Sequence, residues 1–199
     1  GDHLHRLTRK ALKQMATPYI DLLVLEWPGT VVAGSGIDMD AMRRESWMAL
    51  QSLHGEGACR AIGVSNFEVK HLKALLPACD VVPHVNQFEY HPKHRDEDLV
   101  RYCRANKIVC VGYMVYGGGR LLEDDTVRRL AHEVERAPTQ VLGRWCLQHG
   151  VVPCTSSRIV EHAAENWDIF RFVLRDRYFR ALDALNTRFK YDWDPRFVD

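Results

Sequence analysis

Residues 57–67, with the sequence GACRAIGVSNF, decide the fold class. The glycine at the start marks a turn, and residues 60–64 form a short apolar run that predicts a buried strand. Ser65 and Asn66 come where that strand ends, and residues 68–76 then show a helical pattern. A strand that leads directly into a helix is one βα unit.

The same unit recurs on both sides of this stretch. Upstream we predict a helix at 4–15, a strand at 19–26, a glycine-containing loop at 29–36, and a helix that starts at Asp38 or Asp40 and ends at 53. Downstream we predict strands at 85–89, 108–113 and 151–154, and helices at 96–105, 124–135, 139–149, 160–167 and 175–185. Apolar strands that alternate with helices predict an α/β fold, a parallel sheet covered by helices, in one domain over residues 1–199.

Three other segments carry weaker patterns. The helix at 4–15 is predicted from the spacing, close to 3.6 residues, of its apolar residues Leu4, Leu7, Leu12 and Met15. The three glycines at 117–119 predict a flexible loop, because no phosphate-binding glycine motif surrounds them. The aromatic tail at 189–199 is expected to pack on the body of the protein.

Composition excludes several classes of protein. The chain has 199 residues, 46% of them hydrophobic, and its 27 Lys and Arg nearly balance 26 Asp and Glu. A net charge of +1 gives no support to nucleic-acid binding, which needs clustered basic residues. The apolar runs are too short to cross a bilayer. An ordinary soluble globular protein is expected.

The cysteines and histidines show no metal-binding pattern. None of the six cysteines forms a Cys-x-x-Cys pair, so we expect free thiols in a reducing compartment, the cytoplasm or an organelle matrix such as that of the mitochondrion. His91 and His94 are close in sequence, but we interpret them as a solvated surface pair and predict no metal site.

Hydrogen-bonding side chains close each of the five predicted strands. They are Glu26, Ser65 and Asn66, Asn86 and Gln87, Tyr113, and Thr155 to Ser157. The carboxyl ends of parallel strands lie on one face, and that face carries the site in α/β folds. Chance polarity at loop starts explains one or two of these residues. The whole set predicts a ligand site.

Two of these positions have open alternatives. A buried amide within a strand, as at Asn86 and Gln87, must bond either a ligand or a neighbouring backbone group. Glu26 is either a solvated or ion-paired carboxylate, or an acid held partly desolvated with a raised pKa. The ring of Tyr113 is placed to stack on a flat ligand.

Together, several ordered motifs resemble those of the aldo-keto reductases, over essentially the whole chain. They are Tyr19 to Leu23, residues 57–67, VNQFEYHP at 85–92, PTQVL at 138–142, Arg144-Trp145, Glu165-Asn166 and Leu182 to Asn186. The resemblance implies a (β/α)8 barrel that reduces carbonyl groups with NADPH.

It also implies residue roles. Ser65, Asn66 and Gln87 match residues that hold the nicotinamide carboxamide, and Tyr113 matches the one that stacks on its ring. The adenosine-side positions match Ser157, Arg158, His162, Glu165 and Asn166. Glu26 stands at the position of the family's catalytic His, as in one steroid-reducing branch, and Trp27 is expected to wall the substrate pocket.

The departures from the family pattern weaken the expected cofactor binding. Ser156 stands where a Lys usually meets the 2′-phosphate, and His162 stands where an Arg usually does; Arg158 is a conjectured substitute. The family's catalytic Asp, Tyr and Lys have no counterpart here, because the chain begins at what resembles the helix before the fourth strand. We expect NADPH binding to be weakened or lost, and this chain alone to be inactive.

The length adds a constraint. An eight-stranded barrel needs about 250 residues, and five strands cannot close on themselves. We therefore expect an incomplete barrel of TIM type, about five of eight βα units, without the N-terminal three. The first residue is Gly1, which suggests a processed or truncated start. A protein partner or a missing N-terminal segment is expected to cover the open edges.

Three functions are consistent with these features. The first is a catalytically degenerate aldo-keto-reductase-like protein that serves as a structural or accessory subunit of a larger assembly. The alternative is the C-terminal part of an NADPH-dependent aldehyde or ketone reductase, completed by an N-terminal segment or a second chain. A weaker third is a module that senses the cofactor without turnover, as in the related potassium-channel β subunits.

Overall fold

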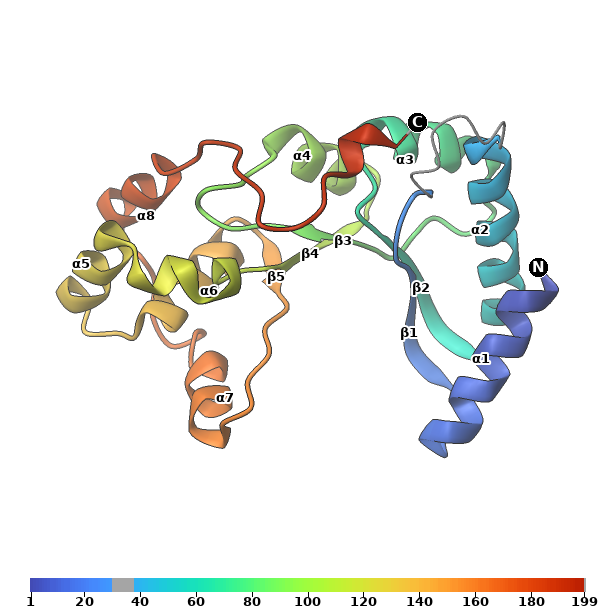
Figure 1. Cartoon of the computed structure of the whole chain (residues 1–199), viewed down its shortest axis with the longest axis horizontal. Helices are drawn as coiled ribbons and strands as arrows, with labels where there is room; N and C mark the ends of the chain where they lie inside the picture. The colour runs from blue at the N-terminus through green and yellow to red at the C-terminus, as the bar shows by residue number, and fades with distance from the viewer. Residues whose placement is uncertain (30–37, 199) are drawn as a thin grey trace. The chain divides into compact units, whose positions relative to one another are not determined.

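The computed structural model describes residues 1–29 and 38–198, so nearly all of the predicted loop at 29–36 lies outside the described residues. The strands are β1 (Ile20–Leu25), β2 (Cys59–Ser65), β3 (Val85–Glu89), β4 (Val109–Tyr113) and β5 (Val151–Pro153). The α-helices are α1 (Asp2–Met15), α2 (Met39–Gly55), α3 (Val69–Leu75), α4 (Glu97–Ala105), α5 (Asp125–Glu133), α6 (Pro138–Gln148), α7 (Val160–Trp167) and α8 (Asp176–Asp183). The 3-10 segments are η1 (Leu76–Ala78), η2 (Gly117–Glu123) and η3 (Pro195–Phe197). Every predicted strand and helix is present (Figure 1).

The chain forms two compact units. The first unit comprises residues 1–87, 98–109 and 194–199, and the second comprises 88–97 and 110–193. Strands β3 and β4 run through both units. The strands follow one another in the sheet in chain order, from β1 to β5.

In the first unit β1, β2 and β3 are parallel. Leu23 is paired with Ile62, and Ser65 is paired with Gln87. The backbone N–H of Val109, at the start of β4, donates to the carbonyl of His84 at 2.9 Å. This register brings the ends of β2 and β3 to the same level.

In the second unit β4 and β5 are parallel, with Cys110 opposite Val151. The backbone N–H of Tyr90, just after β3, donates to the carbonyl of Tyr113 at 3.0 Å. The predicted α/β fold with five parallel strands is therefore confirmed. The single-domain interpretation and the number of missing barrel units stay predictions.

Helices cover the sheet in each unit. In the first, α2 packs on β1 and β2, and α1 packs on α2 (Figure 1). The core there includes the fully buried side chains of Trp47, Leu53 and Ile62. In the second unit α6 packs on β5, and Trp145 of α6 stacks on Tyr90 with ring centroids 5.1 Å apart. Each such buried apolar side chain stabilises the fold by roughly 1.5–3 kcal/mol.

The start of α2 is fixed by one of the two candidate aspartates. Asp38 is the N-cap, and its carboxylate accepts a hydrogen bond from the backbone N–H of Ala41 at 2.9 Å. Asp40 lies within the first turn and pairs with Arg43 instead.

Two local features add detail to the predictions. Residues 117–119, predicted as a loop, stand at the start of the 3-10 segment η2, but their φ angles of 57°, 63° and 92° are not helical and are ones that glycine alone adopts at no steric cost. Leu7 and Met15 are 48% and 55% exposed. The buried residue of α1 is Thr8, and α1 packs against α2.

The tail packs in part as predicted, although Phe189 and Phe197 are 51% and 75% exposed. Val198 is 3% exposed in the first unit, and the backbone N–H of Tyr191 is bound in the second. All six cysteines are free thiols, and four of them are buried. No helix in the described part of the chain is both long and apolar enough to span a membrane.

Candidate functional site

The ends of three neighbouring strands are joined in the first unit. The hydroxyl of Ser65, the last residue of β2, donates to the carbonyl of Gln87 at 2.9 Å, and the backbone N–H of Asn66 donates to the same oxygen at 2.7 Å. The side-chain amide of Asn66 donates to the carbonyl of Glu26 at 3.1 Å. The structure thus brings together Ser65, Asn66, Gln87 and Glu26, as the sequence predicted.

Asn66 has an unusual backbone. Its φ of 63° lies in the left-handed region, which asparagine tolerates better than most residues. This conformation turns the chain sharply after β2, and both Ser65 and Asn66 are 4% exposed. Burial and the turn therefore hold Ser65 and Asn66 in place at the end of β2.

The side chain of Gln87 has a different status from the rest of this group. Its backbone carbonyl is bonded twice, but its half-buried carboxamide makes no hydrogen bond to any residue in the described ranges. A carboxamide offers both donors and an acceptor. Its chemistry fits the carboxamide of a nicotinamide ring, which offers the same groups in return.

Asn86 takes the structural alternative. Its side chain is 0% exposed and its amide donates to the carbonyl of Phe67 at 2.8 Å and to the Cys103 sulfur at 3.7 Å. It thereby joins β3 to the segment that follows β2. Of the two amides, that of Gln87 is therefore the more accessible, whereas Asn86 is fully buried and its Oδ1 has no hydrogen-bond partner among the described residues.

Glu26 and Trp27 follow β1. The Glu26 side chain is exposed, which favours the solvated carboxylate over a desolvated acid. Trp27 is half-buried. The backbone here is fixed on both sides, because Asn66 donates to the carbonyl of Glu26 and the buried Arg43 donates to that of Pro28 at 3.0 Å.

The second unit contains the remaining predicted residues. Tyr113 is half-buried at the end of β4. The same unit has a pocket of about 300 Å³. The residues that line it include Tyr116, Thr155, Ser157, Asn166, Trp167 and Phe170. The Tyr116 hydroxyl donates to the Asn166 side chain at 2.8 Å. Burial raises the pKa of Tyr116 to about 12, so the hydroxyl stays a donor.

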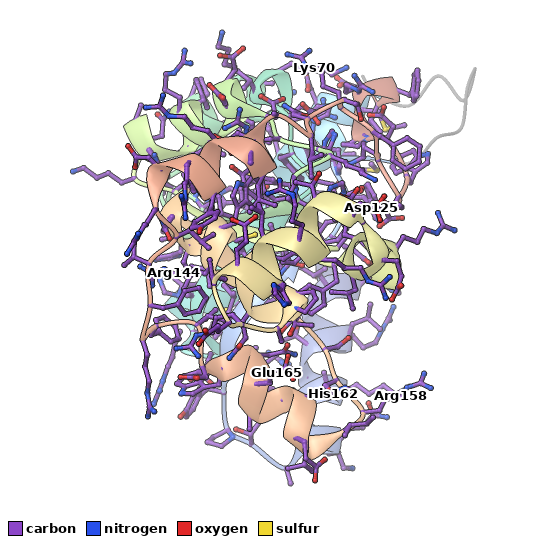
Figure 2. All side chains as sticks on the ribbon, turned by 90° about the vertical axis from the view of Figure 1, so that its left-hand side faces the viewer. Lys70, Asp125, Arg144, Arg158, His162 and Glu165 are labelled. Carbon is purple, nitrogen blue, oxygen red and sulfur yellow. The ribbon has the colours of Figure 1, made fainter. Side chains whose placement is uncertain are left out.

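Some residues on and before α7 form hydrogen bonds within the protein, and others are exposed on its surface. Glu165 accepts a hydrogen bond from the hydroxyl of Thr139, and Ser157 bonds the backbone of Ile159 in its own turn. Arg158 and His162 are exposed near the start of α7, and Glu165 lies farther along it (Figure 2). The structure therefore places Ser157 and Asn166 in the pocket but leaves Arg158 and His162 on the surface.

A buried ionic cluster was not predicted. His91 is 0% exposed, so its interpretation as a solvated residue is wrong; its Nε2 lies 2.8 Å from the carboxylate of Glu89, which is also fully buried. Burial alone would raise the pKa of Glu89, but hydrogen bonds from His91 and from the Tyr191 backbone, with the charge of Lys190, lower it to about 2. The only signal in the sequence was an acidic residue at the end of a predicted strand, at Glu89.

No cluster of three or more His, Cys, Asp or Glu side chains that could hold a metal ion is found within residues 1–29 and 38–198.

Known proteins similar to this chain share one family. The family model described as "Aldo/keto reductase family" matches residues 2–187. The chain is 36% identical over 177 residues to glyoxal reductase from Bacillus subtilis, which covers 89% of this chain and 60% of that protein. It is 31% identical over 189 residues to the oxidoreductase YtbE of the same organism, covering 95% of this chain and 64% of that protein. The chain thus spans less than two thirds of the length of these relatives.

Solved structures agree. A Gox0644 mutant in complex with NADPH superposes with a TM-score of 0.87 at 31% identity, covering 98% of this chain and 69% of that one. An aldo-keto reductase of the silkworm, Bombyx mori, also solved with NADPH, superposes with a TM-score of 0.86 at 27% identity, covering 96% of this chain and 61% of that one. The chain belongs to the aldo/keto reductase family.

Proposed function

We propose that the chain forms the cofactor-binding portion of a reductase that reduces aldehydes or ketones with NADPH. The observation that carries this proposal is the hydrogen-bonded group of Ser65, Asn66 and Gln87 at the ends of β2 and β3. Its one unengaged amide, on Gln87, has the donors and acceptor that a nicotinamide carboxamide needs. The relatives solved with NADPH support the choice of cofactor.

Within this function the cofactor supplies a hydride to the carbonyl carbon. In the first unit Gln87 and Asn66 would orient the nicotinamide carboxamide. In the second unit Tyr113 matches the family residue that stacks on the nicotinamide ring. Ser157, Glu165 and Asn166, with the pocket beside them, hold the adenosine end. Glu26 polarises the substrate carbonyl and Trp27 walls the pocket, while the proton comes from a tyrosine outside this chain, as in the family.

A second candidate is an accessory subunit that has lost catalysis. Glu26 at the position of the family's His favours it, as do Ser156 and His162 at the positions of the Lys and Arg that meet the 2′-phosphate. Ser156 is neutral, and the exposed Arg158 and His162 have no described partner that fixes them toward the pocket. This candidate combines weak cofactor binding with no turnover.

Either function involves a covering for the sheet. Within the described residues β1 pairs only with β2, and Leu22 on β1 is 38% exposed. A strand from an N-terminal segment or from a protein partner would pair with this edge and bury that surface. We propose that such a segment completes the barrel.

Binding of NADPH, followed by the change in tryptophan fluorescence, tests the shared part of both candidates. Gln87→Leu removes the amide at similar volume and should raise the dissociation constant about tenfold. Gln51→Leu is a matched control, because Gln51 bonds only the backbone of Val81 in the same unit. Equal loss in both variants, or no binding by the wild type, would contradict the proposal.

Turnover decides between the candidates. The protein is purified with whatever native partners accompany it, its mass is measured, and NADPH oxidation is followed with glyoxal as the first substrate. Turnover supports the reductase. NADPH binding without turnover of glyoxal or a panel of other aldehydes and ketones supports the accessory subunit.

A further inference from the structure

Residues 187–193, here called the strap, follow α8 in the second unit (Figure 1). The carboxylate of Glu89, at the end of β3, binds this strap. It accepts hydrogen bonds from the backbone N–H groups of Tyr191 at 2.6 Å and Asp192 at 3.2 Å, and the Lys190 ammonium lies 3.1 Å away. His91 supplies a further bond at 2.8 Å. One buried carboxylate thus fixes three consecutive strap residues.

A second attachment lies at the start of the strap. The carbonyl of Lys93 accepts hydrogen bonds from the backbone N–H groups of Thr187 at 3.3 Å and Phe189 at 2.9 Å. The Lys93 ammonium itself pairs with Asp124, the N-cap of α5, at 2.9 Å. The strap is therefore held in one register along the loop that follows β3.

This register places the ring of Tyr191 directly on Gly117. A Cβ atom at Gly117 would come within 2.5 Å of the Tyr191 ring, closer than any real contact, and the φ of Gly117 is 57°. The Arg120 guanidinium lies 5.5 Å from the centre of the same ring. The strap thus packs against the turn that follows β4.

That turn, residues 114–119, shapes the cavities of the second unit. Hydrogen bonds from Gly117 to Met114 at 2.7 Å and from Gly119 to Tyr116 at 2.9 Å close it. Tyr116 lines the pocket of about 300 Å³ and bonds Asn166 there. With Gly118 it also lines an adjoining cavity of about 270 Å³ that includes Ser156.

We propose that Glu89 and Tyr191 are positioning residues: Glu89 tethers the strap, and Tyr191 sets the 114–119 turn that walls the ligand pocket. The inference rests on the proposed function only for the identity of the ligand. Neither side chain lines either cavity, so both act through the turn. A buried ion pair is a weak source of stability because desolvation offsets its attraction. What the carboxylate adds is direction, since its two oxygens fix two successive backbone amides.

The test combines hydrogen–deuterium exchange with NADPH binding. Tyr191→Ala removes the ring but keeps the backbone bonds to Glu89, and Tyr191→Phe keeps the ring. We expect peptides that cover residues 114–121 to exchange about tenfold faster in Tyr191→Ala, and the dissociation constant for NADPH to rise about tenfold. Tyr191→Phe should restore both to within about twofold of the wild type, and Glu89→Gln should resemble Tyr191→Ala.

Gln148→Leu is the control for general loss of stability. Gln148 bonds the backbone of Leu174 through both ends of its amide and accepts a hydrogen bond from Arg144, in the same unit, and none of these bonds involves the strap or the turn. This variant should unfold more easily with unchanged exchange at 114–121. Unchanged exchange there in Tyr191→Ala, or equal acceleration in Gln148→Leu, would overturn the inference. If the wild type binds no NADPH, the proposed function fails, and the exchange data alone decide on the strap.

Discussion

His71 makes two hydrogen bonds that only a neutral imidazole can make together. Its Nδ1 accepts from the backbone N–H of Glu68 at 3.0 Å, and its Nε2 lies 2.9 Å from the carbonyl of Val198. Burial, reinforced by the charge of Arg43, lowers the pKa of His71 to about 4. A proton on Nδ1 would break the first bond.

This histidine makes stability depend on pH. Its folded pKa lies below the unfolded value of 6.5, so the unfolded state binds a proton first as the pH falls. The resulting stability is complete above pH 6.5 and is lost toward pH 4. We expect the free energy of unfolding to drop by on the order of 1–2 kcal/mol between pH 7 and 4.5 from this group.

Urea unfolding of His71→Gln at the two pH values checks this. The variant should be less stable at pH 7 by about 1–2 kcal/mol, because bonds are lost. Its further loss at pH 4.5 should be smaller than that of the wild type; some loss remains because burial also lowers the pKa of His94 to about 4. His132→Gln, at an exposed position, is the control. The same pH dependence in His71→Gln and the wild type would rule out the assignment.

Asn66 combines backbone strain with a side-chain bond, and two substitutions separate them. Both Asn66→Ala and Asn66→Gly lose the side-chain bonds, including those to Glu26 and Ser65, but only Asn66→Ala keeps a Cβ at a φ of 63°. We expect Asn66→Ala to be less stable than Asn66→Gly by about 1 kcal/mol. Urea midpoints at unchanged slope measure the difference, and equal midpoints would show that the turn is unstrained.

At the scale of elements, local patterns predicted well. Apolar runs and helical spacing located every strand and helix, because those signals come from burial on one face of the sheet or helix. The cap of α2 needed the structure, since Asp38 and Asp40 satisfy the same rule. Helical spacing predicted α1 but does not tell which of its apolar residues are buried, and Leu7 is exposed.

Part of the candidate site could also be predicted from local sequence patterns, and part could not. Ser65, Asn66 and Gln87 were predicted to converge because parallel strands align their carboxyl ends, and they do; their roles toward a cofactor stay predictions. The hydrogen bond between Glu89 and Tyr191 of the strap joins residues that are 102 positions apart in the chain. No local pattern carries such a pairing. The only hint was the charge of Glu89 at the end of β3.

The cap of α2 gives a prediction at this scale. Asp38→Ala leaves the N–H of Ala41 without its acceptor and should lower the free energy of unfolding by about 1 kcal/mol. Asp38→Ser should recover most of the loss, since serine caps equally well. Chemical denaturation compares the two, and full stability of the alanine variant would show that the cap contributes nothing.

At the scale of the whole molecule, binding of NADPH should raise the free energy of unfolding. The chain covers 60% and 64% of the two curated relatives described above, and the activity of the whole protein is a proposal for that reason. If the strand ends bind NADPH, a concentration of 100 times the dissociation constant should stabilise the fold by about 2.7 kcal/mol. A rise in melting temperature with NADPH that is about half as large in Gln87→Leu at the same concentration checks this, because a tenfold weaker binder is stabilised by only about 1.4 kcal/mol; an unchanged melting temperature of the wild type would contradict it.

A crystal structure of the protein with NADPH tests the central claim most directly. The account predicts the nicotinamide carboxamide within about 2.7–3.2 Å of the side-chain amides of Gln87 and Asn66. A nicotinamide bound without contact to either side chain, or no bound cofactor at saturating concentration, would contradict it.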